Sequence, residues 1–194
     1  MKVLILEGIP TSGKSTLTEI IKEKLEGLSV SVATEAETHE PIMEQANDLH
    51  ISFFENLIKK LVIEQPDLII FDRLYLTQAS RAGAGLAEYS AIENLLSRHN
   101  ALTVFLRVDE QAIAERIVKA IKHRDSSSDD SFEWGEYFKT KGTTDRKIAD
   151  HYIAQQQNQT KLLYTSTLPY MVCDTTHHDY SEITQQILKK LLLK

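Results

Sequence analysis

The chain has 194 residues, of which 42% are hydrophobic and 26% are charged, and its formal net charge at pH 7 is −6. Length and composition predict one soluble globular domain, residues 1–194, that needs no disulfide or structural metal. A mildly acidic chain without a concentrated basic face is not expected to bind nucleic acid, and no apolar stretch approaches the ~20 residues of a membrane span. The only cysteine, Cys173, suits a reducing compartment, so we expect a cytoplasmic protein.

Apolar runs alternate with segments of helical periodicity along the whole chain. Strands are predicted over residues 2–6, 29–34, 67–72, 101–108 and 169–174. The first of these runs is interpreted as a buried strand, because it is too short for a signal peptide. Helices are predicted over residues 14–26, 41–61, 86–99, 110–121, 145–164 and from residue 181 onward. This alternation indicates βαβ units, so the predicted fold class is α/β with a mainly parallel sheet covered on both faces.

A glycine-rich segment joins the first strand to the first helix. It reads Gly8-x4-Gly13-Lys14-Ser15, which matches the phosphate-loop pattern in its expected strand–helix context. Such a loop turns backbone N–H groups inward, and the following helix adds the positive end of its dipole. Lys14 is expected to reach the β- and γ-phosphates of ATP, and the Ser15 hydroxyl to ligate Mg²⁺. The predicted cofactor-binding residues are Gly8, Pro10, Thr11, Ser12, Gly13, Lys14, Ser15 and Thr16.

The third predicted strand ends in the pair Asp72-Arg73. In an open α/β sheet, ligands bind at the carboxyl ends of the strands, so both side chains are placed at the site. Asp72 is predicted to hold the metal together with Ser15, and Arg73 to contact phosphate oxygens. The alternative is that Asp72 caps the following helix and Arg73 pairs with it at the surface.

Basic residues cluster after the fourth strand. Arg116 is predicted on a helix face, Arg124 lies just beyond that helix, and Arg146 lies further along the chain. The intervening segment, about residues 122–146, is polar and rich in Ser, Asp and Gly, so it is predicted to form a lid. A mobile loop with arginines can surround the γ-phosphate with cations and exclude water. The alternative is a solvated face, which we favour for Lys119 and Lys122.

These elements together resemble the thymidylate kinase and deoxynucleoside kinase group of P-loop kinases. The resemblance rests on the segments 7–16, 71–73 and 116–124, and on the last predicted strand. It implies a three-layer P-loop kinase fold with a five-stranded parallel sheet and a lid segment. It also implies an ATP donor, a nucleoside or nucleoside monophosphate as the small-molecule acceptor, and a homodimer.

The sequence departs from this group's pattern in two places. Pro10 stands where thymidylate kinases usually carry an acidic residue, which weakens that specific interpretation. Deoxynucleoside kinases place a glutamate after strand two, often before a proline, to take the proton of the acceptor hydroxyl. Glu40 precedes Pro41, whereas Glu35 lies closer to the end of the strand, and Glu37 is a third candidate. Glu35 and Glu40 are therefore both carried as candidate catalytic residues.

The acceptor cannot be identified from the sequence. Candidates for its pocket are Phe53, Phe54, Tyr75, Gln78 and Arg81, with weaker candidates in Asn47 and His50. Aromatic residues at helical spacing equally fit a core. A GTPase is disfavoured because the Asp-x-x-Gly pattern is absent after the third strand. A small-molecule kinase with a non-nucleoside acceptor and a non-catalytic ATP-binding module remain as alternative functions.

Overall fold

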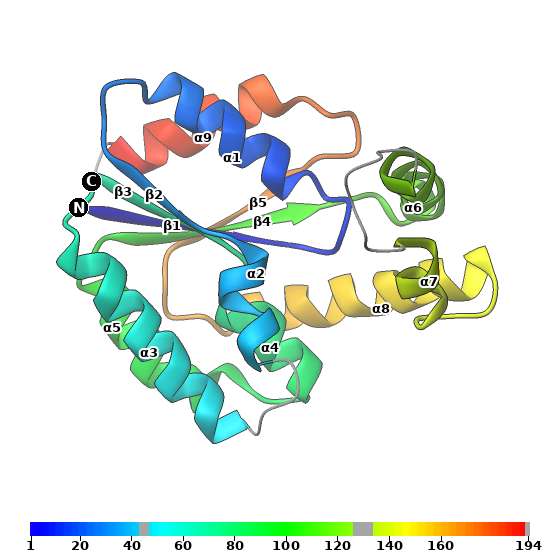
Figure 1. Cartoon of the computed structure of the whole chain (residues 1–194), viewed down its shortest axis with the longest axis horizontal. Coiled ribbons are helices and arrows are strands. Elements are labelled where there is room, and N and C mark those ends of the chain that lie inside the picture. Colours follow the sequence, from blue (N-terminus) through cyan, green and yellow to red (C-terminus); the bar gives the residue numbers. More distant parts are fainter. Residues whose placement is uncertain (43–46, 126–133, 193–194) are drawn as a thin grey trace.

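The computed structural model describes residues 1–42, 47–125 and 134–192, with the backbone alone at residues 40, 47, 48, 123–125, 134 and 192. Within this part of the chain, five parallel strands form one sheet in the order β2-β3-β1-β4-β5 (Figure 1). They are β1 (Lys2–Glu7), β2 (Val30–Ala33), β3 (Leu68–Asp72), β4 (Ala101–Arg107) and β5 (Tyr170–Asp174). The predicted α/β class and five-stranded parallel sheet are confirmed.

Helices cover both faces of this sheet. The α-helices are α1 (Lys14–Lys24), α2 (Glu35–Thr38), α3 (Asn47–Ile63), α4 (Tyr75–Ala82), α5 (Ser90–Ser97), α6 (Glu110–Asp125), α7 (Trp134–Lys139), α8 (Asp145–Leu163) and α9 (Tyr180–Leu192). Two 3₁₀ helices are η1 (Glu40–Ile42) and η2 (Leu86–Tyr89). Helices α1 and α9 lie on one face, and α3, α5 and α8 lie on the other, so the molecule has three layers (Figure 1). No helix in the described residues is both long and apolar enough to cross a membrane.

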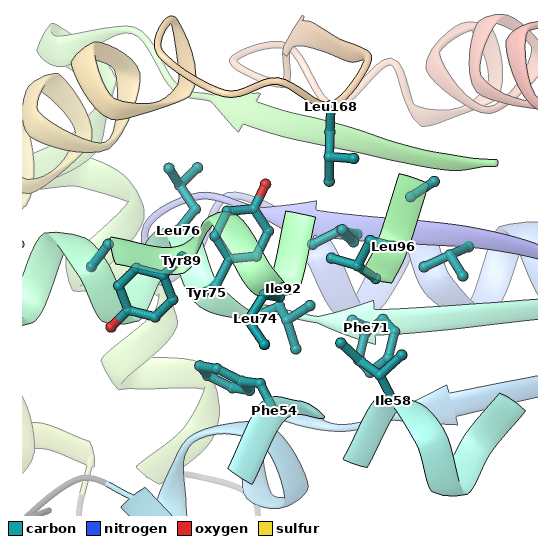
Figure 2. Packing of buried hydrophobic residues seen from close by; sticks show 14 of the residues in the cluster. Phe54, Ile58, Phe71, Leu74, Tyr75, Leu76, Tyr89, Ile92, Leu96 and Leu168 are labelled. Carbon is teal, nitrogen blue, oxygen red and sulfur yellow. The ribbon is translucent and has the colours of Figure 1, made fainter. Parts of the chain in front are cut away.

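Alternating side chains of the buried strands supply two cores. In β1, Val3 and Ile5 belong to the core under α3, α4 and α5, whereas Leu4 and Leu6 belong to the core under α1 and α9. This is the period-two pattern of a strand buried on both faces. Figure 2 shows Phe54 and Tyr75 in the first core, where both are almost completely buried. These two candidates for an acceptor pocket are therefore core residues.

Three short helices were not predicted from the sequence, α2, α4 and α7. Helix α4 has only eight residues, and its buried residues 75–79 include the polar Thr77 and Gln78, so the segment shows no extended apolar period. Helix α7 lies within the segment that we interpreted as aperiodic, and its Phe138 packs against Tyr152 of α8. The rest of the predicted lid includes residues 126–133, which lie outside the described part of the chain.

The second predicted helix also differs at its start. Backbone of 3₁₀ type occupies Glu40–Ile42, and α3 begins at Asn47 rather than at Pro41. The helix predicted over residues 86–99 is divided into η2 and α5.

A buried carboxylate ties α5 to the other elements on its side of the sheet. Glu93 Oε1 accepts hydrogen bonds from the Tyr75 hydroxyl of α4 (2.9 Å) and from Ser166 Oγ (2.5 Å). Its Oε2 accepts from the backbone N–H (3.0 Å) and the hydroxyl (2.6 Å) of Thr167, in the turn before β5. Glu93 thus satisfies four donors at once.

We predict that Glu93→Ala lowers the free energy of unfolding by about 2–4 kcal/mol, because buried donors would lose their acceptor and a cavity would form. Urea unfolding measures the change. Glu115→Ala is the matched control, since Glu115 is exposed and, among the described residues, forms an ion pair with Lys119 alone, one turn along α6. Equal unfolding midpoints for the two variants would contradict the prediction.

Candidate phosphate-transfer site

The phosphate loop connects β1 to α1, and its glycines are required by close packing. Gly8 has a φ of 142°, and a Cβ there would lie 2.6 Å from the carbonyl oxygen of Leu106. Gly13 has a φ of 93°, and a Cβ there would overlap the ring of Tyr180 at the start of α9. Both positions therefore exclude a side chain by backbone conformation and by space.

Lys14 points back into this loop. Its Nζ donates hydrogen bonds to the carbonyls of Gly8 (3.2 Å) and Ile9 (3.1 Å), and the side chain is buried. Burial, followed by the nearby Arg73, lowers the pKa of Lys14 to about 8. The ammonium group is thus held at the loop without a carboxylate partner among the described residues, which favours an incoming anion.

Other loop groups are arranged in a way that suits phosphates. Thr11 Oγ1 and Ser12 Oγ are buried and have no hydrogen-bond partner among the described residues. Ser15 and Thr16 are exposed in the first turn of α1, whereas Pro10 is half-buried. The loop residues therefore fit the predicted nucleotide, with exposed hydroxyls at a helix N-terminus. Their individual contacts with ATP stay a prediction.

Asp72 and Arg73 lie at the carboxyl end of β3, beside β1, as predicted. Asp72 Oδ1 is buried and has no hydrogen-bond partner among the described residues. The residue that caps α4 is Leu74, so Asp72 does not cap that helix. Arg73 is only 1% exposed and donates from Nη1 to the carbonyl of Gly8 (2.6 Å). The surface pair that we considered as an alternative is therefore excluded.

Glu35, the first residue of α2, forms an ion pair with Arg73. Its Oε1 lies 2.8 Å from Arg73 Nε and 3.9 Å from Arg81 Nη2, and 45% of its side chain remains exposed. Burial would raise the pKa of Glu35, but Arg73 and Lys14 outweigh it and lower this pKa to about 2. An ionised, accessible carboxylate thus lies beside the phosphate loop.

The other two glutamates after β2 are placed differently. Glu37 accepts the backbone N–H of Thr34 (2.9 Å) in a capping box, so its carboxylate is used to begin α2. Glu40 belongs to η1, and its side chain lies outside the described residues. Of the candidate bases, the structure brings Glu35 to Lys14 and Arg73.

The side chain of Arg116 is held by hydrogen bonds to backbone carbonyls. It donates from Nη1 to the carbonyl of Thr11 (3.1 Å), and from Nη2 to the carbonyls of Thr175 and Thr176. It therefore links the phosphate loop to the turn between β5 and α9. The side chain of Arg124 lies outside the described residues, and Arg146 is exposed in α8. The roles of Arg116 and Arg124 in catalysis stay predictions.

Buried polar residues also occur in the segments that follow β2 and β3. His39 is buried, and burial, followed by Arg81 and Arg73, lowers its pKa well below the usual value. Gln78 Nε2 lies 3.0 Å from His50 Nδ1, and both residues are buried. Sequence reasoning missed His39 because a histidine in an acidic loop carries no pattern of its own.

Metal ligands and cavities elsewhere do not add to this site. Among the described residues, no group of three or more His, Cys, Asp or Glu side chains could hold a metal ion. A cavity of about 510 Å³ lies between α8 and the turn that follows β4. It is lined by Arg107, Asp109, Glu110, Gln111, Gln156, Gln157, Thr160 and Lys161. None of the predicted site residues belongs to this lining.

Comparison with known proteins supports the fold. No protein-family model matches the sequence, and no curated protein matches it. Among solved structures, YorR from Bacillus subtilis in complex with phosphorylated GDP has a TM-score of 0.63 at 18% identity, covering 99% of this chain and 96% of that one. Thymidylate kinase from Candida albicans has a TM-score of 0.58 at 16% identity, covering 99% and 91%. Shikimate kinase from Bacteroides thetaiotaomicron has a TM-score of 0.57 at 15% identity, covering 99% and 98%.

The chain therefore has the P-loop kinase fold, and the resemblance inferred from the sequence is confirmed at this level. A shikimate kinase and a thymidylate kinase both have this fold, so it does not select the acceptor.

The lowered pKa of Lys14 gives a prediction for nucleotide affinity. Only the protonated lysine attracts phosphate, so affinity for Mg²⁺ and a non-hydrolysable ATP analogue should be constant between pH 7 and 7.5. Above pH 8 it should fall by up to about tenfold per pH unit, as the lysine of the free protein loses its proton. Calorimetric titration measures this. Lys14→Met should bind weakly and show no such fall; parallel profiles for both proteins would contradict the assignment.

Proposed function

We propose that this chain is a kinase that transfers the γ-phosphate of ATP to a nucleoside or nucleoside monophosphate, and that of these two the acceptor is a nucleoside. The observation that carries the proposal is the ionised Glu35 carboxylate beside Arg73 and the phosphate-loop Lys14. Phosphoryl transfer depends on charge neutralisation around the phosphate and on the orientation of the attacking group. This corner of the fold contains groups for both tasks.

The donor side consists of the phosphate loop and the end of β3. Lys14 would bind the β- and γ-phosphates, and the loop N–H groups would cradle them. Ser15 and Asp72 would hold Mg²⁺, which neutralises negative charge on the phosphates when bound. The buried Asp72 Oδ1 without a hydrogen-bond partner among the described residues supports this role, because a buried carboxylate oxygen needs a donor or a cation.

The acceptor side is defined by Glu35. Its pKa of about 2 keeps it ionised at every physiological pH, so it can accept a hydrogen bond from an attacking hydroxyl. Because the transition state of phosphoryl transfer is loose, orienting the hydroxyl matters more than strong basicity. Glu35 would receive the proton of the hydroxyl as its oxygen bonds to the γ-phosphorus and the bond from that phosphorus to the bridging oxygen of the departing ADP breaks.

The same carboxylate disfavours a monophosphate acceptor. The charge of Glu35 already balances that of Arg73, at 2.8 Å, and Arg81 lies 3.9 Å from the same oxygen. A phosphate placed here would be repelled by Glu35 or would have to displace it from both arginines. A neutral hydroxyl meets no such cost, which supports a nucleoside or another alcohol as the acceptor.

A panel of acceptors tests this proposal. The protein is incubated with ATP, Mg²⁺ and nucleosides, nucleoside monophosphates or shikimate, and ADP release is followed beside Lys14→Ala. We expect release that depends on a nucleoside and is lost in the Lys14→Ala control. Release with monophosphates alone would contradict the nucleoside assignment, and release with shikimate would favour a non-nucleoside acceptor. Bound ATP without transfer to any acceptor would indicate a binding module.

Two neighbouring glutamates provide a matched pair for the base assignment. Glu35→Gln should lower kcat by about 10²–10⁴-fold, because the amide cannot accept the proton of the hydroxyl. Glu37→Gln should stay close to the wild type, because an amide oxygen can still cap α2. Steady-state kinetics with the acceptor found above measures both. A large loss in Glu37→Gln with an active Glu35→Gln would overturn the assignment.

A further inference from the structure

Glu7 ends β1 directly before the phosphate loop, and its carboxylate is completely buried. Its Oε1 accepts backbone N–H groups from Leu74 (2.9 Å) and Thr77 (3.4 Å). Its Oε2 accepts the hydroxyl of Thr77 (2.5 Å). A buried negative charge next to a phosphate site opposes anion binding, so its presence requires a compensating role. All of these hydrogen bonds come from the segment that follows Arg73.

Arg73 has a backbone conformation that residues with a Cβ atom rarely adopt. Its φ of 66° lies in the left-handed region, which costs a non-glycine residue roughly 1–2 kcal/mol. Such a conformation persists only where the surroundings impose it. On one side the Arg73 N–H donates to the carbonyl of Leu6 (2.9 Å), and on the other Glu7 binds the N–H of Leu74. The backbone of Arg73 is thus fixed on both sides by β1.

This conformation determines where the guanidinium points. From it, Arg73 Nη1 reaches the carbonyl of Gly8 at 2.6 Å, and Nε lies 2.8 Å from Glu35. Both contacts place the guanidinium between the phosphate loop and the candidate base. A change in the turn after Arg73 would move these contacts without altering any group that touches a substrate.

Thr77 connects this arrangement to α8. Its hydroxyl donates to Glu7, and the same oxygen accepts from Gln159 Nε2 (3.2 Å) and Arg73 Nη1 (3.4 Å). Thr77 and Gln159 are both fully buried. One donor and two acceptor sites are the full capacity of a hydroxyl, so every hydrogen-bonding position of Thr77 is used.

We propose that Glu7 and Thr77 are positioning residues that hold Arg73 in its left-handed conformation, and thereby set the orientation of its guanidinium for phosphoryl transfer. Neither residue contacts the nucleotide or the acceptor in this assignment. The catalytic consequence rests on the proposed function, whereas the effect on Arg73 does not. A purely structural role would instead change stability and leave the guanidinium unchanged.

The kinetic test uses isosteric variants. Thr77→Val keeps the shape and removes the hydroxyl, Thr77→Ser keeps the hydroxyl, and Thr103→Val makes the same exchange in the buried strand β4. We expect Thr77→Val to lower kcat by about tenfold or more with KM for ATP within about twofold, and the other two variants to resemble the wild type. Glu7→Gln, which cannot accept the Thr77 hydroxyl at its amide nitrogen, should repeat the loss and serves if Thr77→Val does not fold. Wild-type kcat in both Thr77→Val and Glu7→Gln would overturn the proposal.

A double-mutant cycle shows whether Thr77 acts through Arg73. In an Arg73→Ala background, Thr77→Val should change kcat by less than about twofold, because the side chain that it positions is gone. The full loss in that background would mean that Thr77 acts independently of Arg73, contrary to the proposal.

An NMR measurement decides the question without turnover. The Nε–H signal of Arg73, assigned by its absence in Arg73→Lys, should exchange with solvent at least about tenfold faster in Thr77→Val than in wild type or Thr77→Ser. Equal exchange in all three would overturn the positioning role. If no acceptor supports turnover in the wild type, the proposed function fails, and this measurement alone then decides whether Glu7 and Thr77 position Arg73.

Discussion

Two cations, Lys14 and Arg73, are buried side by side at the carboxyl edge of the sheet, and the rest of the site is arranged around the cost of burying them. Removing a charged group from water is costly unless it is paired or hydrogen-bonded. Arg73 contacts Glu35 and the carbonyl of Gly8, whereas the hydrogen-bond partners of Lys14 within the described part of the chain are loop carbonyls. The burial of Lys14, followed by repulsion from Arg73, lowers the pKa of Lys14. An anion with several oxygens is the ligand that most effectively offsets the cost of burying these two positive charges.

The parallel sheet is what brings these cations together. Leu6 of β1 pairs with Asp72 of β3, so the next residues along the two chains, Glu7 at the end of β1 and Arg73 just after β3, lie next to each other. In a parallel sheet both chains leave at the same edge, where α1 begins and α2 ends against β3. The site is therefore a consequence of strand register, and a shift by one residue would separate Arg73 from the phosphate loop.

Features encoded in contiguous residues could be predicted, and features that depend on tertiary contacts could not. The phosphate loop was recognisable because glycine spacing, strand and helix all lie within 14 residues, positions 2–15. The sequence left Glu35 and Glu40 as alternatives because only the folded chain shows that Glu35 faces Arg73. Helix α4 was missed because it has only eight residues, which is too short to show an extended apolar period, and with it the importance of Thr77 was missed. An acidic residue at the end of an apolar strand was the one visible signal for Glu7.

The charges of the site nearly cancel before any ligand binds. Lys14, Arg73 and Arg81 face Glu7, Glu35 and Asp72, and the whole chain carries a formal charge of −6. Long-range attraction therefore contributes little to the capture of a nucleotide that is itself negative. Affinity must come instead from short-range groups fixed in advance, namely the loop N–H groups, the α1 N-terminus and the oriented Lys14. A site built in this way depends on geometry more than on charge, which is why a buried carboxylate such as Glu7 is compatible with a phosphate loop when it fixes the position of a cation.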